Sequence, residues 1–426
     1  MKINTLHFKN IFLILSLFIF SWVVFAIFHE ESPDVGRNGF YATTHGNFPD
    51  NQNVAIALAG LNAPSGADVF KHGRFVIDTY KNTLNDFLAK LIIEKAGKLS
   101  FVGNSEEFDC WLDYSIEKTN ENCASPERIK LLLIENKELL SRYAQLFDLP
   151  CLHEGTWNGQ TVINLNKLIS AEIQLDVEAG NAEAAYKKWF ANHQFISNVL
   201  KQEGNALNRA IFLVVDGINL DSLENLLFKS PETGINHFDK LNPTLKSNGL
   251  ESYNLKGMMR AEYTLVNDLL KKQKKIAYLH PEFIRNRIYR AQMDFLDKAQ
   301  KPPSTFEVSR NELNKKYGFS TLNLMGYYWL DPYNSMLANM ITGGFIKGLY
   351  LVSSMHTKNS LICLLNLSVQ IKQQKIVKIE IQAFLDRAGI ENNCPFTNKP
   401  MQFDSEKNII FCENPETKSR VAQVRI

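Results

Sequence analysis

The sequence predicts a mainly α-helical protein with one N-terminal transmembrane helix and a small C-terminal β-hairpin. An uncharged apolar run fills residues 11–28, apolar residues recur at helical spacing in many later segments, and two strand-like segments flank a polar turn near the C-terminus. We therefore expect a cytoplasmic tail (1–10), an anchor (11–28), a spacer (29–50), an extracytoplasmic body of stacked helix hairpins (51–390) and a β-hairpin tail (391–426).

The apolar run, IFLILSLFIFSWVVFAIF, is long enough to span nearly the whole hydrocarbon layer at about 1.5 Å per residue. Lys2 and Lys9 precede it and three acidic residues follow it. Because basic residues mark the cytoplasmic side of a transmembrane helix, we expect the N-terminus in the cytoplasm and the body outside. The alternative is a signal peptide cleaved after Ala26, although that site lies inside the run and signal peptides have shorter apolar segments, about 7 to 15 residues.

The composition is that of an ordinary folded protein. The chain is 45% hydrophobic and 22% charged, with a formal net charge of +2. This balance disfavours both a disordered chain and a nucleic-acid binder. Six cysteines are too few to build a fold from disulfides, so apolar packing must form the core. At about 150 residues per domain, the body is long enough for one large or two ordinary domains.

Helix signals begin in earnest at Ser125, a good N-cap, followed by Pro126 at the first helical position. Apolar residues then recur at helical spacing and predict one buried stripe: Ile129, Leu132, Leu133, Leu139, Leu140, Tyr143 and Leu146.

A helix hairpin is predicted over residues 165–204. Gly180 can end its first helix in the left-handed conformation, Asn181 can cap the second, and Gly204 can stop it. Such a short connection requires an antiparallel pair. The segment EAGNAEAAYKKWF resembles the turn and second-helix start of a tetratricopeptide repeat, in one unit only and without a second copy at the 34-residue period. The residues expected to face the partner helix are Ala185, Trp189, Phe195, Ile196 and Val199.

Further helical patterns cover residues 205–228, 255–273 and 360–374. Pro302 and Pro303 mark a break, which is either a domain boundary or a loop inside one helical array. Beyond Gly389, which ends the last helix, MQFD and NIIF predict two strands around the turn SEK.

Common catalytic signatures are absent: there is no phosphate loop, no G-x-G-x-x-G after a strand, no H-E-x-x-H and no G-x-S-x-G. CLHEG (151–155) has no second pair of metal ligands nearby and is interpreted as a surface loop. SSMHT (353–357) sets two serines near a histidine, but triad members meet through the fold, so loop or helix-end polarity explains it. We therefore expect no metal and no cofactor.

The cysteines predict disulfides, because nearby cysteines oxidise in a periplasm or lumen. Cys110 and Cys123 enclose a polar loop, and Cys394 and Cys412 enclose the terminal hairpin. Pairing the second couple needs an extra fold-back, which the turn-prone FTNKP can supply. Zinc would need two further ligands. Of the remaining cysteines, the one in the apolar helix is expected to be a buried thiol and the other has no partner: Cys363 and Cys151.

Positive charge gathers at KKQKK (271–275) and in the arginines that follow it. It could meet anionic lipid or an acidic partner, or form a solvated helix face. Residues of the types enriched at binding hot spots lie close by and are the candidate partner-binding residues: Tyr278, Arg285, Tyr289 and Arg290.

The segment CPFTNKPMQFD resembles the DPFTGKPL-Y tail of bacterial membrane-anchored envelope proteins, and NVAIALAGLNAPSGAD near the anchor fits the same layout. Cys394 stands where that pattern has Asp, and Asn398 where it has Gly. The resemblance covers about a tenth of the chain and implies an uncharacterised proteobacterial inner-membrane protein with a periplasmic body.

Two functions remain open. Stacked helix hairpins favour a periplasmic scaffold or binding module for another envelope protein. The alternative is an envelope hydrolase whose site is assembled from distant residues. An apolar groove rimmed by charge would favour the scaffold, whereas a deep polar pocket with a titratable pair of displaced pKa would favour the enzyme.

Overall fold

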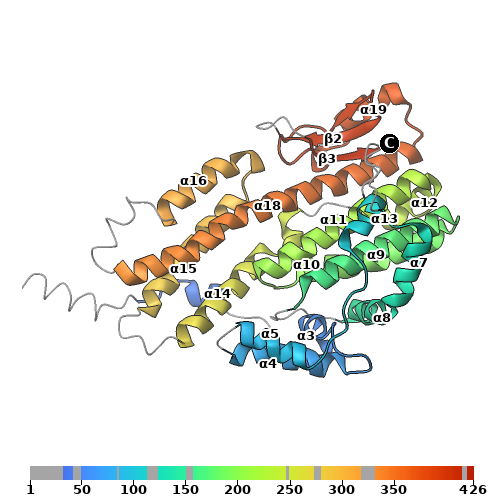
Figure 1. Cartoon of the computed structure of the whole chain (residues 1–426). Helices are drawn as coiled ribbons and strands as arrows, with labels where there is room; N and C mark the ends of the chain where they lie inside the picture. The colour runs from blue at the N-terminus through green and yellow to red at the C-terminus, as the bar shows by residue number, and fades with distance from the viewer. Residues whose placement is uncertain are drawn as a thin grey trace, which may run out of the picture. The chain divides into compact units, whose positions relative to one another are not determined.

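The structure is a computed structural model, and it describes residues 32–41, 49–83, 86–112, 123–149, 157–245, 249–272, 280–317, 332–414 and 420–426. The protein is mainly helical and ends in a small antiparallel sheet (Figure 1), which confirms the predicted fold class at that level. The expected anchor, residues 11–28, lies outside the described residues. Within them, no helix has both the length and the apolar character needed to cross a membrane.

The chain divides into two compact units. Unit 1 contains the described residues of 32–41, 259–301 and 305–351, and unit 2 contains those of 49–258, 302–304 and 352–426. The residues of two helices, α14 (Leu255–Lys272) and α18 (Pro332–Gln373), are shared between the units.

Unit 2 begins with short helices that pack through glycine. Its first elements are η1 (Asp50–Gln52), α3 (Val54–Ala59), α4 (Val69–Asn82) and α5 (Asp86–Lys95). A Cβ atom on Gly60 would lie 1.8 Å from the carbonyl oxygen of Val69, and one on Gly73 would lie 1.9 Å from that of Ile56. Only glycine fits at both positions, so α3 and α4 touch backbone to backbone.

The Ser125-capped helix is confirmed but is shorter than the predicted stripe. The elements here are η2 (Ser105–Phe108), α6 (Asp109–Leu112), α7 (Pro126–Glu135), α8 (Lys137–Gln145) and η3 (Leu146–Asp148). Ser125 accepts a hydrogen bond from the backbone of Arg128. The helix is interrupted at Asn136, whose side chain accepts from the backbone N–H of Val102 and donates to its carbonyl. The stripe still faces inward, because Leu132 and Leu139 on either side of the break are buried.

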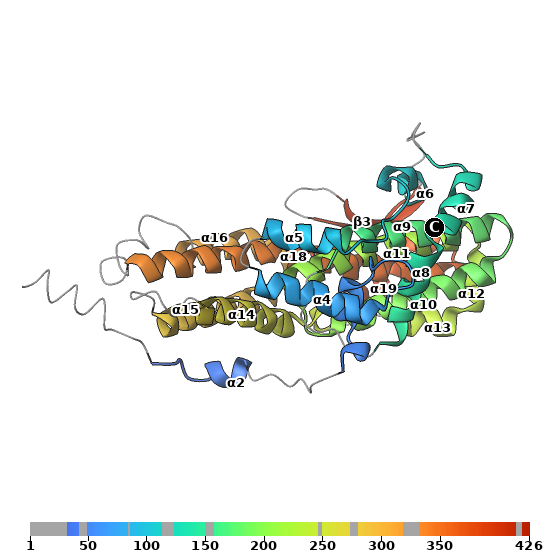
Figure 2. The same cartoon turned by 60° about the horizontal axis from the view of Figure 1, so that its bottom comes forward.

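Three long helices form the centre of unit 2: α9 (Gly159–Glu178), α10 (Ala182–Lys201) and α11 (Ala206–Lys229). They run side by side in both views (Figures 1 and 2), and α11 packs on both of the others. Gly180 has a φ of +79°, as predicted for the end of the first helix. Asn181 is at the N-cap position of α10, but its side chain makes no capping hydrogen bond. Its backbone carbonyl accepts from the backbone N–H groups of Ala184 and Ala185. All five residues predicted to face the partner helix are buried.

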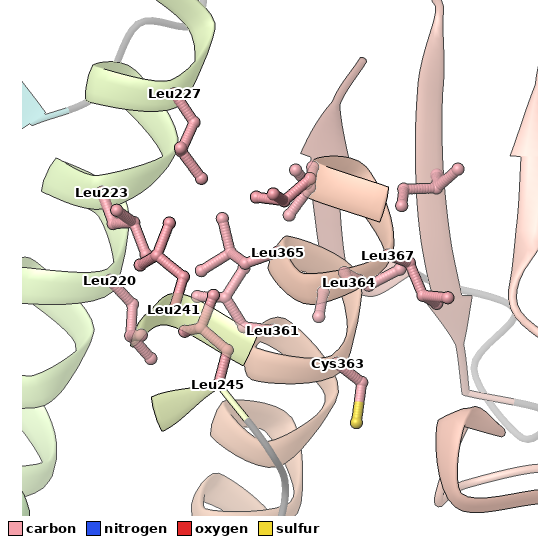
Figure 3. Packing of buried hydrophobic residues seen from close by; sticks show 14 of the residues in the cluster. Leu220, Leu223, Leu227, Leu241, Leu245, Leu361, Cys363, Leu364, Leu365 and Leu367 are labelled. Atoms are coloured by element: carbon pink, nitrogen blue, oxygen red, sulfur yellow. The ribbon is translucent and has the colours of Figure 1, made fainter. Parts of the chain in front are cut away.

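The apolar core of unit 2 joins α11 to the C-terminal half of α18. The next elements in the sequence after α11 are α12 (Pro231–Asn236), α13 (Phe238–Thr244) and η4 (Gly249–Tyr253). Figure 3 shows leucines of α11 and α13 facing Leu361 and Leu365 of α18. Cys363 is buried in the same helix and belongs to neither disulfide, which confirms the predicted buried thiol.

The C-terminal sheet has one strand more than predicted. After η6 (Lys378–Glu380), α19 (Ile381–Arg387) and η7 (Ile390–Asn392), the chain forms β1 (Gln402–Asp404), β2 (Ile409–Glu413) and β3 (Arg420–Arg425) in that order. Gln402 lies opposite Phe411, and Ile410 opposite Val424. The predicted hairpin is therefore β1 and β2, and RVAQVR adds a third strand that buries Ala422 and Val424.

Unit 1 contains α2 (Arg37–Tyr41), α15 (Pro281–Ala299) and α16 (Phe306–Tyr317), with most of α14 and the N-terminal part of α18. The short helix η5 (Pro303–Thr305) has residues in both units. Helices α15 and α16 pack on one another within this unit. Pro302 and Pro303 connect α15 to α16, and residues 302–304 belong to unit 2 whereas both helices belong to unit 1, so both interpretations of this break stay predictions.

Candidate functional site

A polar cavity of about 220 Å³ opens in unit 2. Its walls come from α10, α11, α13, η4 and α18, and most of the lining side chains carry hydrogen-bonding groups. The polar lining residues are His193, Gln194, Ser197, Asn198, Lys201, Asp216, Thr244, Ser252, Tyr253 and Asn359.

A buried histidine and a buried aspartate meet at this cavity. His193 is 4% exposed and Asp216 is 3% exposed. The Nδ1 atom of His193 lies 3.8 Å from Oδ1 of Asp216, which is too long for a hydrogen bond. Among the described residues, Nδ1 of His193 has no hydrogen-bond partner. Trp189 stacks on the imidazole with ring centroids 5.0 Å apart and planes inclined by 12°, which holds the ring in place.

Burial displaces the pKa values of both groups. It lowers the pKa of His193 to about 4, and the nearby charge of Lys201 acts in the same direction. It raises the pKa of Asp216 to about 6, against the attraction of Lys358 and together with the repulsion of Asp221. At neutral pH the histidine is therefore uncharged and the aspartate is mostly ionised.

Tyr253 and Asn359 form another part of the wall. The Tyr253 hydroxyl donates to Oδ1 of Asn359 at 3.3 Å. Burial raises the pKa of Tyr253 well above its usual range, with further contributions from Asp216 and Cys363, so the hydroxyl stays protonated. The Tyr253 hydroxyl thus keeps the hydrogen that it donates to Asn359.

Arg209 of α11 fixes the backbone around the cavity. Its guanidinium donates to the carbonyls of Leu200 and Tyr253, and to that of Gln202 at 2.6 Å. Burial lowers the pKa of Arg209 to about 10, which leaves it charged at neutral pH. One buried cation therefore ties the end of α10 to the end of η4, the two elements that carry Lys201 and Tyr253.

Three of the four predicted partner-binding residues, Arg285, Tyr289 and Arg290, lie on α15 of unit 1. The fourth, Tyr278, is outside the described residues. Arg285 donates to Oδ1 of Asn267 at 3.0 Å and pairs with Glu282. Arg290 makes two bonds of 2.7 Å to the carboxylate of Asp34.

Tyr289 packs edge-on against Phe40 and Tyr41. The three described residues of the predicted set therefore all contact other residues of the chain. Their role in binding a partner stays a prediction.

Both predicted disulfides are present. The Cα atoms are 5.7 Å apart in Cys110–Cys123 and 5.3 Å apart in Cys394–Cys412. The expected fold-back is also present: the Cys394 amide donates to the carbonyl of Lys399, and Asn398 takes a φ of +53° in the turn. Together the disulfides indicate an oxidising, extracytoplasmic compartment.

Two other sequence features resolve differently. CLHEG, with Cys151, lies outside the described residues. SSMHT is neither a loop nor a helix end, because it lies inside α18. Its histidine, His356, is partly buried, and the loss of solvation lowers its pKa to about 4. Among the described residues, no group of three or more His, Cys, Asp or Glu side chains could hold a metal ion.

The sequence analysis missed His193 and Asp216. Neither residue belongs to a motif, and they lie on different helices. One available signal was Asp216 itself, since this acid interrupts the apolar stretch IFLVVDGINL of a predicted helix, and acids are rarely buried without a partner.

The comparisons with known proteins assign no class to this fold and cavity. No protein-family model matches the chain, and neither a curated protein nor a solved structure does.

Proposed function

We propose that the chain is a membrane-anchored protein whose extracytoplasmic unit 2 binds a small polar ligand in this cavity. The observation that carries the proposal is the buried pair of His193 and Asp216, which face the cavity without a hydrogen bond between them. A buried polar group without a partner costs about 1 to 3 kcal/mol. A ligand that supplies the missing partners recovers that free energy.

The size of the cavity sets the size of the ligand. Its 220 Å³ corresponds to roughly seven water molecules at about 30 Å³ each. Drug-sized ligands occupy larger pockets, about 300 to 1,000 Å³. The cavity therefore fits a molecule of the size of an amino acid or a monosaccharide.

The helical framework supports the same function. In this proposal α9 and α10 form one hairpin of a stacked array, on which α11 packs. Because the cavity draws residues from both α10 and α11, a bound ligand bridges neighbouring layers. The anchor at 11–28, the periplasmic location and the kinship with DPFTGKPL-tailed envelope proteins belong to the proposal. Reporter fusions after residue 60 test its topology, since a reporter that works only in the cytoplasm should be inactive there.

A thermal-shift screen of small polar compounds on the full chain tests ligand binding. We expect at least one compound to raise the melting temperature, and Asn359→Ala to remove that shift because it alters the cavity wall. Asn236→Ala, on an exposed position of α12, is the matched control and should keep the shift. If every compound that binds raises the melting temperatures of Asn359→Ala and Asn236→Ala equally, the cavity is not the binding site.

An envelope hydrolase is the second candidate, and the displaced pKa values of His193 and Asp216 favour it. A histidine that is neutral at pH 7 can accept a proton, but its pKa of about 4 makes it a weaker general base than one whose pKa lies near the working pH. However, within the described residues no hydroxyl or thiol is hydrogen-bonded to His193, as an activated nucleophile would be. Turnover of peptide, ester or glycoside substrates that His193→Gln abolishes without unfolding the protein would establish the hydrolase instead.

A partner scaffold, the leading expectation from the sequence, stays a proposal with a separate site on α15. Replacing Arg285 and Arg290 by alanine should then weaken recovery of a partner after crosslinking. Ligand binding in unit 2 and a scaffold role in unit 1 are compatible, because the residues involved are different.

A further inference from the structure

We propose that the ligand of the unit 2 cavity is a zwitterion with a primary ammonium group, of the size of an amino acid or a dipeptide. In this arrangement the ammonium lies between Asp216 and His193, and the acidic end of the ligand lies near Lys201. The inference rests on the proposed function and specifies its chemistry.

Asp216 carries a buried charge. Its carboxylate lies almost wholly inside the protein, and among the described residues only longer-range charges act on it, without a hydrogen bond. Lys358 acts on it only through longer-range attraction, and Asp221 opposes that attraction. Buried charges in proteins are normally paired with an opposite charge and hydrogen-bonded. A ligand cation satisfies both needs, whereas an uncharged hydroxyl satisfies only the second.

The geometry of His193 and Asp216 suits an ammonium group. A neutral imidazole can accept at Nδ1, and a carboxylate can only accept. The two acceptor atoms are 3.8 Å apart. An ammonium group has three hydrogens, so a single nitrogen placed beside both atoms can donate to each. A hydroxyl has one hydrogen and can donate to only one of them.

Lys201 is placed to bind the anionic end of the ligand. His193, Ser197 and Lys201 all line the cavity and are spaced one helical turn apart on α10, so they follow one face of that helix. Lys201 is the one lysine among the described lining residues, and its charge reaches His193 strongly enough to lower the pKa of that histidine. An anionic group on the ligand would pair with Lys201 and weaken its repulsion of the ammonium held at Asp216.

The charges of the cavity lining match those of a ligand with no net charge. The lining carries one acid, Asp216, and one base, Lys201, while His193 is uncharged at neutral pH. A zwitterion matches both charges. A simple amine would leave Lys201 unpaired, and a simple carboxylate would face Asp216.

Isothermal titration of the full chain at pH 7 tests the inference with four probes: L-alanine, L-alanyl-L-alanine, ethanolamine and glucose. We expect at least one of the two zwitterions to bind more tightly than ethanolamine, and glucose not to bind. Asp216→Asn should weaken the zwitterion by about 10- to 100-fold, as expected for the loss of a charged hydrogen bond.

A second variant protects the test against misfolding at the buried aspartate. Lys201 is exposed, so Lys201→Met should leave the fold intact. It should weaken zwitterion binding by about tenfold or more, whereas ethanolamine should bind no more weakly than to wild type because its ammonium is no longer repelled by Lys201. Lys187→Met is the matched control on the same helix, because its side chain is 72% exposed and lies outside the cavity lining.

The outcomes separate the two proposals. If glucose binds and Asn359→Ala removes that binding, the cavity is a ligand site but the ligand is not a zwitterion. If the zwitterion binds equally well to wild-type protein and both cavity variants, this inference is wrong. If none of the four probes binds, the inference is overturned, and the proposed function then fails only if the wider screen of polar compounds also finds no ligand in the cavity.

Discussion

Asn192 of α10 donates from its side-chain nitrogen to the amide oxygens of both Asn166 and Asn219, at 2.9 Å and 3.1 Å. One buried amide therefore joins α9, α10 and α11. Asn166 donates in turn to the hydroxyl of Tyr143 at 2.9 Å. This polar layer fixes how the three helices are aligned along their axes. It lies one residue from His193, so it also sets where the imidazole meets the cavity.

Replacing Asn192 by alanine should lower the free energy of unfolding by about 2 to 4 kcal/mol. The change leaves the buried oxygens of Asn166 and Asn219 without a donor, and each such group costs about 1 to 3 kcal/mol. Urea denaturation followed by circular dichroism measures the change. Asn236→Ala, at an exposed position, should shift stability by no more than about 0.5 kcal/mol. Equal effects of the two substitutions would show that the amide layer does not stabilise the helices.

Local signals allowed most of the helices to be predicted. Ser125, Gly180 and Gly389 mark element ends through their own capping or backbone preferences, and the structure places ends at all three. The interruption at Asn136 was not predictable in this way, because it depends on bonds to Val102, far away in the sequence. Strand β3 was missed for a similar reason, since RVAQVR becomes a strand by pairing with β2.

The cavity could not be predicted, because it is a product of helix packing. His193 and Asp216 each look like an isolated polar residue on an amphipathic helix, and only the contact between α10 and α11 brings them together. The disulfides were predictable because sequence proximity and turn chemistry alone limit their pairing. Cys394 and Cys412 meet through a short fold-back whose residues are all local.

Stability should depend on pH through Asp216. Its pKa is raised from the ordinary 3.8 to about 6, so the folded state holds this proton more tightly than the unfolded state does. That contribution is fully present below about pH 3.8 and is lost as the pH rises through about 6. Asp216→Asn removes the titration. The free energy of unfolding of the variant minus that of wild type should therefore rise by on the order of 3 kcal/mol from pH 4 to pH 7.

Urea denaturation of both proteins at several pH values measures this difference. Both proteins keep His193, so its own acid-induced loss of stability largely cancels in the comparison. Asp239→Asn, at an exposed acid of α13, is the control. Its curve of unfolding free energy against pH should run parallel to that of wild type. Parallel curves for Asp216→Asn as well would mean that Asp216 titrates as an ordinary aspartate.

The disulfide Cys394–Cys412 should stabilise the C-terminal tail by roughly 3 kcal/mol. It closes a loop with a sequence separation of 18, and the chain-entropy model gives about this value for such a loop. Both cysteines are buried, so the double variant to alanine keeps their apolar character. We expect faster amide hydrogen exchange in β1 and β2 of the variant. In wild type, non-reducing peptide mapping should recover the two cysteines as one linked pair, and free thiols at both positions in protein from the native envelope would exclude the bond.

Two arginines that hold the segment 32–41 on α15 should differ greatly in importance. Arg37 is 4% exposed, and it donates to Oδ1 of Asn286 at 2.6 Å and pairs with Glu282. Arg37→Met removes two hydrogen bonds donated by a charged group, each of which contributes about 1.5 to 3 kcal/mol, while Glu282 keeps its pair with Arg285. The Arg290 side chain is 45% exposed where it pairs with Asp34, and exposed pairs contribute about 0 to 1 kcal/mol.

Hydrogen exchange of the peptide covering residues 32–41 compares Arg37→Met with Arg290→Met in the full chain. Exchange in this segment reports its local opening, and each 1.4 kcal/mol corresponds to a tenfold change in the opening equilibrium. Arg37→Met should therefore accelerate exchange by about 100-fold or more, whereas Arg290→Met should change it by less than about tenfold. Because Arg290→Met removes one positive charge that also joins the segment 32–41 to α15, it controls for the loss of charge alone. Similar exchange rates in the two variants would mean that the buried contacts of Arg37 do not hold this segment in place.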